Sequence, residues 1–391
     1  MDKIKPLMEA NEFEDKVCSG KLTRRQAHKV LASAGVGTAM ATSMPGMARA
    51  DGSDLVMFTW GGYDDAAFAQ DYVREYGSPP TYTLFSDQAE AMAKIRAGFE
   101  VDVVFPCSSK IGLWYDAGIV EPVDVSMISH WDDVIEPLKH VPGANTADGQ
   151  PLWVPEDFGA TAIIVNTELA PEYADPEMWS WSIFFDEKYA GRLAMFDAVE
   201  DHFNLFAIYA GIDFTDMNDE QIETVANLVR ESLPNMRLLT SDTTSMTQAL
   251  FSGEVVASAA WNGMMLTASG EMDATGTQGK YIWMNPKEGA LTWVCGLTID
   301  PRTKERGTYE QAHALLDAYI SPESQYYELT EWGYGVSNKK VYDMEGITEE
   351  YLQSIGLSSD IEAYLASGKF SVHQNRYGEI VNLYEQILAG M

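Results

Sequence analysis

Residues 55–63 read LVMFTWGGY, and this stretch joins an apolar strand-like run to an unusual turn. Leu55 to Trp60 is rich in β-branched, aromatic and other apolar residues, which is typical of a buried strand. Gly61 and Gly62 then free the backbone to turn. Turns are normally polar, yet this one is flanked by Trp60 and Tyr63. These two aromatic side chains must face a core, a partner or a ligand.

The chain continues from this turn in an alternation of strands and helices. Strands are expected over 55–60, 81–85 and 101–105, with helices over 66–75 and 89–97 between them. Asp64 and Asp65 suit the positive N-terminus of the first helix. Strand–helix–strand spacing of this kind predicts a parallel sheet with helical crossovers.

Ligands bind beyond the carboxyl ends of the strands in such sheets. Two polar or aromatic turns, 60–63 and 107–109, lie at such ends. The sequence therefore predicts that Trp60 and Tyr63 face a cleft.

A second α/β unit is expected beyond Trp153. Its strands are expected over 160–166, 192–196, 237–240, 255–261, 281–285 and 291–299, and the remaining helices over 203–209, 220–233, 244–251, 309–320, 323–332 and 377–388. The 291–299 strand is expected to cross back toward the first unit. Two units without a Pro/Gly-rich linker imply several chain crossings, and hence a hinge.

Composition and charge limit the possible partners. The 391 residues are 46% apolar and 11% aromatic, as in a globular protein. They include 26 basic and 59 acidic residues, a net charge of −33. Such a charge argues against nucleic acid or an anionic membrane as a partner, and suits a cationic ligand or a surface built for salty water.

The first fifty residues are expected to be an export signal. A basic segment, 23–29, precedes the uncharged run Val30–Ala41, and Ala48-Arg49-Ala50 offers the small residues that a signal peptidase recognises. The arginine pair resembles a twin-arginine signal, although Ala27 and His28 stand where that pattern prefers Phe and Leu. We therefore expect a periplasmic protein, exported by the twin-arginine route, with no later membrane span.

Removing residues 1–50 would leave 18 basic and 54 acidic residues and two cysteines, Cys107 and Cys295. Two cysteines can form one bond in an oxidising compartment, but the sequence does not show whether they meet. Buried cysteines more often pack as inert small apolar residues.

Several motifs recur in the order and spacing of a known family. They are Phe58–Tyr63, Val101–Pro106, Phe158–Asn166, Trp261-Asn262-Gly263, Pro286–Gly289, Trp293, and Gly333-Tyr334 with Asn338. Together they make the chain resemble the periplasmic spermidine/putrescine-binding proteins, the extracellular solute-binding proteins of ABC importers.

The resemblance implies an α/β fold of the two-lobe periplasmic-binding-protein type (type II-like), with hinge crossovers between the lobes. Lobe 1 would comprise 51–156 and 293–337, and lobe 2 mainly 157–292. The C-terminal helical segment, 338–391, would belong mainly to lobe 2.

The resemblance also implies a set of ligand-binding residues. An aromatic box would hold the methylene chain and cationic groups, and carboxylates would pair with the amines. The box would consist of Trp60, Tyr63, Trp261, Trp293 and Tyr334; Cys107 and Ser109 would lie at strand-end contacts, Asp201 would bind an amine, and Gln374 would approach from the C-terminal segment.

Three positions depart from the family pattern. Cys295 stands where the family has an acid that pairs with an amine, Ala198 replaces a second acid, and Cys107 replaces a hydroxyl residue. Since a buried ammonium needs a carboxylate, a long polyamine fits poorly. Glu156 and Asp157 are candidates to restore the charge from another wall; otherwise the ligand has a single cationic centre or is not an amine.

Each candidate has a purely structural alternative. The aromatic side chains can be core residues, and Asp201 can cap a helix that begins near His202. The pair Tyr326-Tyr327 resembles the iron-coordinating tyrosines of ferric-binding relatives, but its helical position favours packing.

We expect a monomeric solute-binding protein rather than an enzyme, which delivers a small cationic ligand to an ABC permease. The sequence contains no G-x-S-x-G, phosphate loop or C-x-x-C, and its histidines show no metal-ligand spacing, so no cofactor or metal is expected. Two rival functions remain. One is binding of a quaternary ammonium or betaine-type osmolyte; the other is ferric-ion binding or an exported enzyme.

Overall fold

The computed structural model describes residues 52–390, so the expected export signal lies outside the described residues. The first half opens with three parallel strands, β1 (Val56–Trp60), β2 (Thr81–Phe85) and β3 (Val103–Val104). Helices α3 (Gln70–Tyr76) and α4 (Gln88–Arg96) connect them. The predicted parallel sheet with helical crossovers is confirmed here.

Helix α3 begins four residues later than the sequence predicts. Residues 66–69 form turns, and Ala69 occupies the N-cap position without a side-chain bond. The Asp64 carboxylate accepts from Gly62 N at 3.0 Å and the Asp65 carboxylate from Ala67 N at 2.9 Å. Both acids therefore stabilise the turn that follows β1 and do not open the helix.

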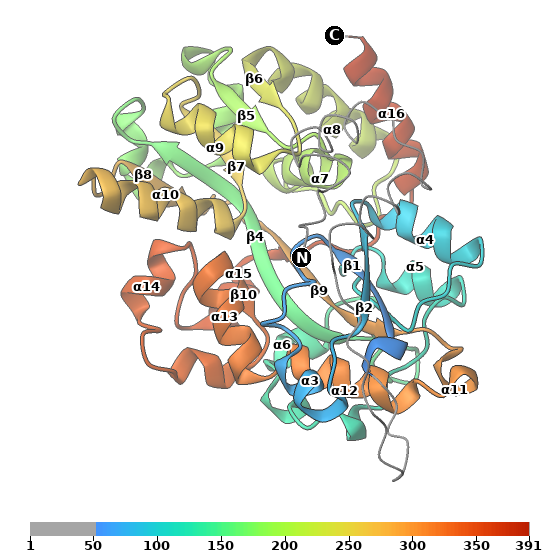
Figure 1. The fold of residues 1–391 in the computed structure, drawn as a ribbon. Coiled ribbons are helices and arrows are strands. Elements are labelled where there is room, and N and C mark those ends of the chain that lie inside the picture. The colour runs from blue at the N-terminus through green and yellow to red at the C-terminus, as the bar shows by residue number, and fades with distance from the viewer. Residues whose placement is uncertain (1–51, 391) are drawn as a thin grey trace, which may run out of the picture. The chain divides into compact units, whose positions relative to one another are not determined.

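Two long antiparallel strands connect the two halves of the sheet. Strand β4 (Val154–Asn166) is buried along all 13 residues and pairs with β9 (Leu291–Ile299) over its first part. Its second part pairs with β7 (Ala257–Ala260) and β8 (Tyr281–Met284). The sheet order is β2-β1-β3-β9-β4-β7-β5-β6, so β4 and β9 lie at its centre and run through the middle of the molecule (Figure 1).

The second half repeats the parallel arrangement. Strand β5 (Leu193–Met195) lies parallel to β6 (Met236–Leu239) and β7. Helices α7 (Val199–Tyr209), α8 (Asp219–Ser232), α9 (Thr243–Phe251) and α10 (Asn262–Thr275) accompany these strands. Helix α8 begins with a capping box between Asn218 and Gln221, and its buried side includes Ile222 and Val225, as its periodicity predicts.

The other elements complete both halves. They are α5 (Ile111–Asp116), α6 (Glu136–Lys139), α11 (Thr303–Arg306), α12 (Tyr309–Tyr319), α13 (Pro322–Trp332), β10 (Gly335–Val336), α14 (Glu349–Ser354), α15 (Ile361–Ser367), β11 (Lys369–Phe370) and α16 (Tyr377–Ala389), with short 3₁₀ turns in the connections. No helix among residues 52–390 is long and apolar enough to cross a membrane.

The buried apolar side chains form two main cores, and β4 contributes to both. Val154 and Phe158 belong to the first core, whereas Ile163 and Val165 belong to the second. Helices α14 and α15 pack into the first core, and α16 packs into the second. This packing differs from the expectation that 338–391 belongs mainly with the second half, because only its last helix does.

Candidate functional site

A cavity of about 430 Å³ lies where side chains from the two cores meet. Ten of the expected site residues line it: Trp60, Tyr63, Cys107, Ser109, Asp157, Asp201, Trp261, Trp293, Cys295 and Tyr334. The lining also includes Gly61 and Ser108 from the two turns expected at this edge, and residues that the sequence did not indicate, namely Asp87, Gln88, Ala89, Lys110, Glu200, Leu291, Trp332, Ser371 and Tyr377. Segments far apart in the sequence thus converge on one site.

Two of the expected residues do not line this cavity. Glu156 is fully buried, and its carboxyl group lies close to that of Glu328 on α13. Gln374 is also buried, and its amide donates to Asn204 on α7. The pairing of β4 with β9 is irregular between Pro155 and Asp157, so the Glu156 and Asp157 carboxyl groups lie close together, but only Asp157 lines the cavity.

The aromatic side chains serve both core and cavity, which answers the question raised by the turn at 60–63. Trp60 donates its indole N–H to Phe105 O at 2.9 Å, and Tyr63 packs edge-on against Phe105 with ring centroids 4.5 Å apart. Trp293 packs edge-on against Tyr334 at 4.9 Å. A side chain at Gly159 would overlap the Trp293 ring, so this glycine lets the ring lie against β4.

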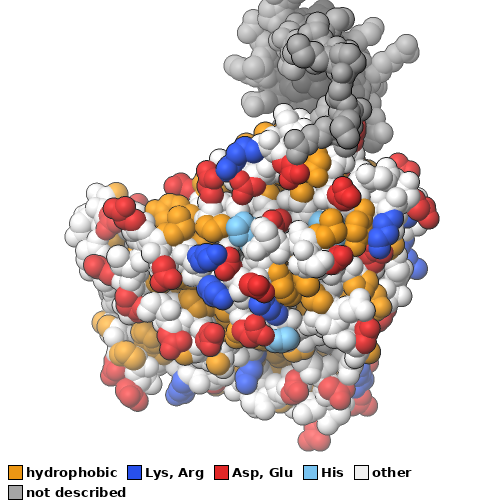
Figure 2. Space-filling model, turned by 90° about the horizontal axis from the view of Figure 1, so that it is seen from below, with side chains coloured by type: hydrophobic (Ala, Val, Ile, Leu, Met, Phe, Trp, Pro, Cys, Tyr) orange, Lys and Arg blue, Asp and Glu red, His pale blue; other side chains and the backbone are white. Residues whose placement is uncertain are grey.

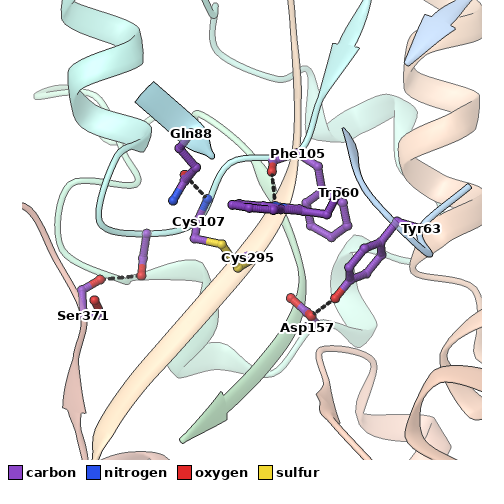
Figure 3. Close-up of a disulfide and its surroundings, with 9 residues drawn as sticks. Trp60, Tyr63, Gln88, Phe105, Cys107, Asp157, Cys295 and Ser371 are labelled. Carbon is purple, nitrogen blue, oxygen red and sulfur yellow. Dashed lines mark hydrogen bonds between the residues drawn. A yellow bond between two sulfur atoms is a disulfide. The ribbon is translucent and has the colours of Figure 1, made fainter. Parts of the chain in front are cut away.

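The two cysteines form a disulfide in the cavity wall, which answers the question, left open by the sequence, of whether they meet (Figure 3). It joins β9 to the loop after β3, across 188 residues of chain. Cys107 N also donates to the Gln88 side chain at 2.8 Å. In the sheet register Cys295 lies opposite both Asp157 and Cys107, so the disulfide stands beside Asp157 where the family pattern has an acid.

Asp157 is a buried carboxylate that faces the cavity. It accepts a hydrogen bond from the Tyr63 hydroxyl (Figure 3), while its second oxygen has no partner among the described residues. Burial raises the pKa of Asp157 to about 6. The second oxygen is thus a buried acceptor without a donor, and a cation beside the carboxylate would favour its charged form.

Asp157 belongs to a fully buried cluster of three carboxyl groups. The other two are those of Glu156 and Glu328, and oxygen atoms of all three lie within 4.8 Å of one another. Burial, followed by repulsion from the neighbouring acids, raises the pKa of Glu156 and of Glu328. The cluster therefore holds protons where free carboxyl groups would be ionised.

Asp201 is the carboxylate of the second half. It lies in the first turn of α7, whose N-cap is Ala198, so the alternative that Asp201 caps a helix beginning near His202 is wrong. Instead its carboxylate accepts from the Thr161 hydroxyl of β4 at 2.8 Å. Burial raises the pKa of Asp201 to about 7.

Lys110, Glu200 and Tyr377 form a cluster that the sequence reasoning missed. The Lys110 ammonium lies 2.8 Å from a Glu200 oxygen and 3.5 Å from the centre of the Tyr377 ring. The Tyr377 hydroxyl donates to the same oxygen at 2.6 Å. Burial acts to raise the pKa of Glu200, but the Lys110 charge and the two hydrogen bonds outweigh it and lower that pKa. The available signals were the position of Lys110 directly after Ser109 and that of Glu200 beside Asp201.

The tyrosine pair of α13 packs outside this cavity, as the sequence favoured. The Tyr326 hydroxyl donates to Glu345 O at 3.1 Å, and the Tyr327 hydroxyl to Asp65 at 3.2 Å. The two hydroxyls thus have different partners, and neither tyrosine lines the site.

The chain belongs to the bacterial extracellular solute-binding protein family, whose sequence profile matches residues 81–352. Members of this family are binding proteins. The fold and the cavity between two cores agree with that class.

Among its relatives is the spermidine/putrescine-binding periplasmic protein 1 of Haemophilus influenzae, 24% identical over 87% of this chain and 89% of the relative. The putrescine-binding periplasmic protein PotF of Escherichia coli is 22% identical over 73% of this chain and 78% of its own length. A solved structure of a putative spermidine/putrescine ABC transporter from Listeria monocytogenes matches with a TM-score of 0.67 and 18% identity, over 86% of this chain and 98% of that one. The two-lobe fold expected from the sequence is thereby confirmed.

Proposed function

We propose that this protein captures a small cationic amine of the polyamine class in the cavity and delivers it to the permease of an ABC importer. The observation that carries the proposal is the pair Asp157 and Asp201. Asp157 is buried and Asp201 half-buried; each carboxylate lies on the cavity wall, and its hydrogen-bond partner from another element is a neutral hydroxyl, that of Tyr63 or of Thr161.

The surroundings of this pair suit an ammonium group. Aromatic faces such as those of Trp261 and Trp293 attract cations and cover methylene groups, and a charged carboxylate binds an ammonium strongly. The protein relatives named for spermidine and putrescine support the same ligand class. A diamine that reaches both carboxylates would contact both halves and thereby favour the closed form.

We also propose the division into lobes that this mechanism needs. Lobe 1 comprises 52–158 and 293–337 together with α14 and α15, and lobe 2 comprises 159–292 together with α16; the boundary follows Phe158 because this residue packs in the first core and pairs with β10. The crossings between them, β4 and β9, would act as hinges.

The expected location of the protein is the periplasm, because the relatives are named as periplasmic proteins. We propose that residues 1–50 direct export by the twin-arginine route. The exported protein would act as a monomer without catalysing a reaction, and the permease complex would supply the energy of transport.

Calorimetric titration of the purified protein with putrescine, spermidine, a betaine and choline tests this proposal. Putrescine is expected to bind and, at a hundred times its dissociation constant, to stabilise the fold by about 2.7 kcal/mol. Asp201→Asn is expected to weaken this binding at least about tenfold, since it removes a charge-assisted bond. Sodium chloride of equal ionic strength is the control.

A quaternary ammonium ligand is the second candidate, because the disulfide replaces an acid while the aromatic walls remain. Binding of a betaine or choline but of no primary amine, with little effect of Asp201→Asn, would replace the polyamine proposal by this one. Quaternary groups rely on aromatic faces rather than on charge-assisted hydrogen bonds.

A further inference from the structure

The cavity contains an ammonium group of its own. Among the described residues that line it, Lys110 is the only lysine or arginine. Its side chain is 11% exposed, and its ammonium touches both the Glu200 carboxylate and the face of the Tyr377 ring. A carboxylate combined with an aromatic face is the environment that an amine ligand would seek.

Lys110 therefore occupies a place that suits a ligand ammonium. One oxygen of Glu200 is satisfied from within the chain, since it accepts from Lys110 at 2.8 Å and from Tyr377 at 2.6 Å, and the Lys110 charge neutralises that of Glu200. Asp87 also lines the cavity but is exposed, and its carboxylate caps α4 by accepting from Glu90 N. Of the four acids on the wall, Asp157 and Asp201 remain for a ligand.

The disulfide takes the place that another carboxylate could occupy between Asp157 and Lys110. Cys295 lies opposite Asp157 in the sheet, and its partner Cys107 begins the loop that leads to Lys110 three residues later. A ligand extending from Asp157 toward Lys110 would thus pass a neutral disulfide and then meet a positive charge. An ammonium placed there would be desolvated without a counter-charge, which is costly.

We propose that Lys110 is a specificity-determining residue that limits the ligand to two ammonium groups, so that the site selects a diamine over a longer triamine. This inference rests on the proposed amine binding. Its physical basis is repulsion: a third ammonium would compete with Lys110 for Glu200, whereas a diamine needs only Asp157 and Asp201.

Titration of the wild type and of Lys110→Met with putrescine and with spermidine, at one ionic strength, tests the inference. The wild type is expected to bind putrescine more tightly than spermidine. In Lys110→Met the ratio of the spermidine to the putrescine dissociation constant should fall about tenfold or more, because Glu200 becomes free for the third ammonium. Comparing ratios cancels a general effect of the substitution on the fold.

The chain offers a matched control in a similar cluster that does not line the cavity. Lys188 lies 2.5 Å from Glu172 and over the Tyr189 ring at 4.9 Å, and the Tyr189 hydroxyl donates to Glu172. Lys188→Met should leave the ratio unchanged. Lys110→Arg keeps the charge and should also preserve it, whereas Lys110→Met/Glu200→Gln should cancel the gain of Lys110→Met.

The inference is overturned if Lys110→Met leaves the ratio unchanged, or if the wild type already prefers spermidine. Should Lys110→Met fail to fold by circular dichroism, Lys110→Gln takes its place with the same expectation. A wild type that binds neither amine would overturn the proposed function itself, an outcome distinct from an unchanged ratio in a protein that does bind them.

Discussion

Asp157 and Asp201 hold protons at higher pH in the folded protein than free aspartate does, because the surrounding protein removes water from both carboxyl groups. Burial raises their pKa values to about 6 and about 7, from an ordinary value of 3.8. The titratable groups around Asp157 are Tyr63, Glu156 and Glu328, and Glu200 lies beside Asp201. None of these neighbours supplies a positive charge.

A cationic ligand should therefore bind more tightly as the pH rises. Below pH 6 the ligand must displace protons from both carboxyl groups, whereas above pH 7 both are already charged. Because the ligand displaces a proton from each carboxyl group, the affinity for putrescine should increase by about 1000-fold between pH 5 and pH 8. Calorimetry at a series of pH values and one ionic strength measures this, and Asp201→Asn should flatten the upper part of the curve. An affinity that stays constant or falls would contradict the assignment of these carboxylates to the ligand.

At the scale of elements, the disulfide ties β9 to the loop after β3. Because it closes 188 residues of chain, it should limit the freedom of the unfolded state strongly. Replacing both cysteines by serine should lower the free energy of unfolding by about 3–5 kcal/mol and the melting temperature by several degrees. Thermal melts with and without dithiothreitol measure the effect.

The double serine variant supplies the control for this prediction, since its melting temperature should not respond to the reductant. A wild type that is equally insensitive to dithiothreitol, with both thiols free in a thiol assay, would contradict the bond.

Elements with a clear periodic pattern could be predicted from the sequence, and those decided by tertiary contacts could not. The strands over 81–85 and 291–299 have the predicted bounds, because each is a continuous strand-type run. Strand β4 begins six residues earlier than predicted, since Pro155, Glu156 and Asp157 read as a polar connection until burial in the sheet is known. Helix α10 was missed because no apolar stripe marks it.

The site residues divide in the same way, into those marked by a local sequence pattern and those that only tertiary contacts bring together. Trp60, Tyr63 and Trp261 could be placed from glycine or Asn-Gly turns at strand ends. The Cys107–Cys295 bond and the contact of Lys110 with Glu200 join residues that are far apart in the chain, so no local pattern indicates them. The place of Glu156 behind the wall could not be predicted either, because it depends on the irregular pairing of β4 with β9 and on the contact with Glu328 of α13.

The whole molecule carries a large excess of negative charge, −33 over the full sequence. Asp and Glu side chains are spread over the face seen in Figure 2, interspersed with fewer basic ones, and they are not gathered into a single patch. Repulsion among such charges opposes folding and weakens when salt screens it.

Salt should therefore stabilise this protein. Raising sodium chloride from about 0.05 M to about 0.5 M shortens the screening length from roughly 14 Å to roughly 4 Å and should raise the melting temperature by several degrees. Potassium chloride at the same concentrations is the control, because screening depends on ionic strength rather than on the cation. A melting temperature that is flat or falls in both salts would show that the repulsion is negligible.

The position of β9 between β3 and β4 has a consequence for how the protein folds during its synthesis on the ribosome. Val103 and Val104 of β3 need Thr298 and Ile299 as strand partners, so the first half cannot complete its sheet until nearly 200 further residues have been translated. At typical ribosomal speeds this delay is roughly ten to forty seconds. During that interval an apolar strand edge stays open, and a nascent chain of this kind needs shielding by chaperones before its two halves can close together.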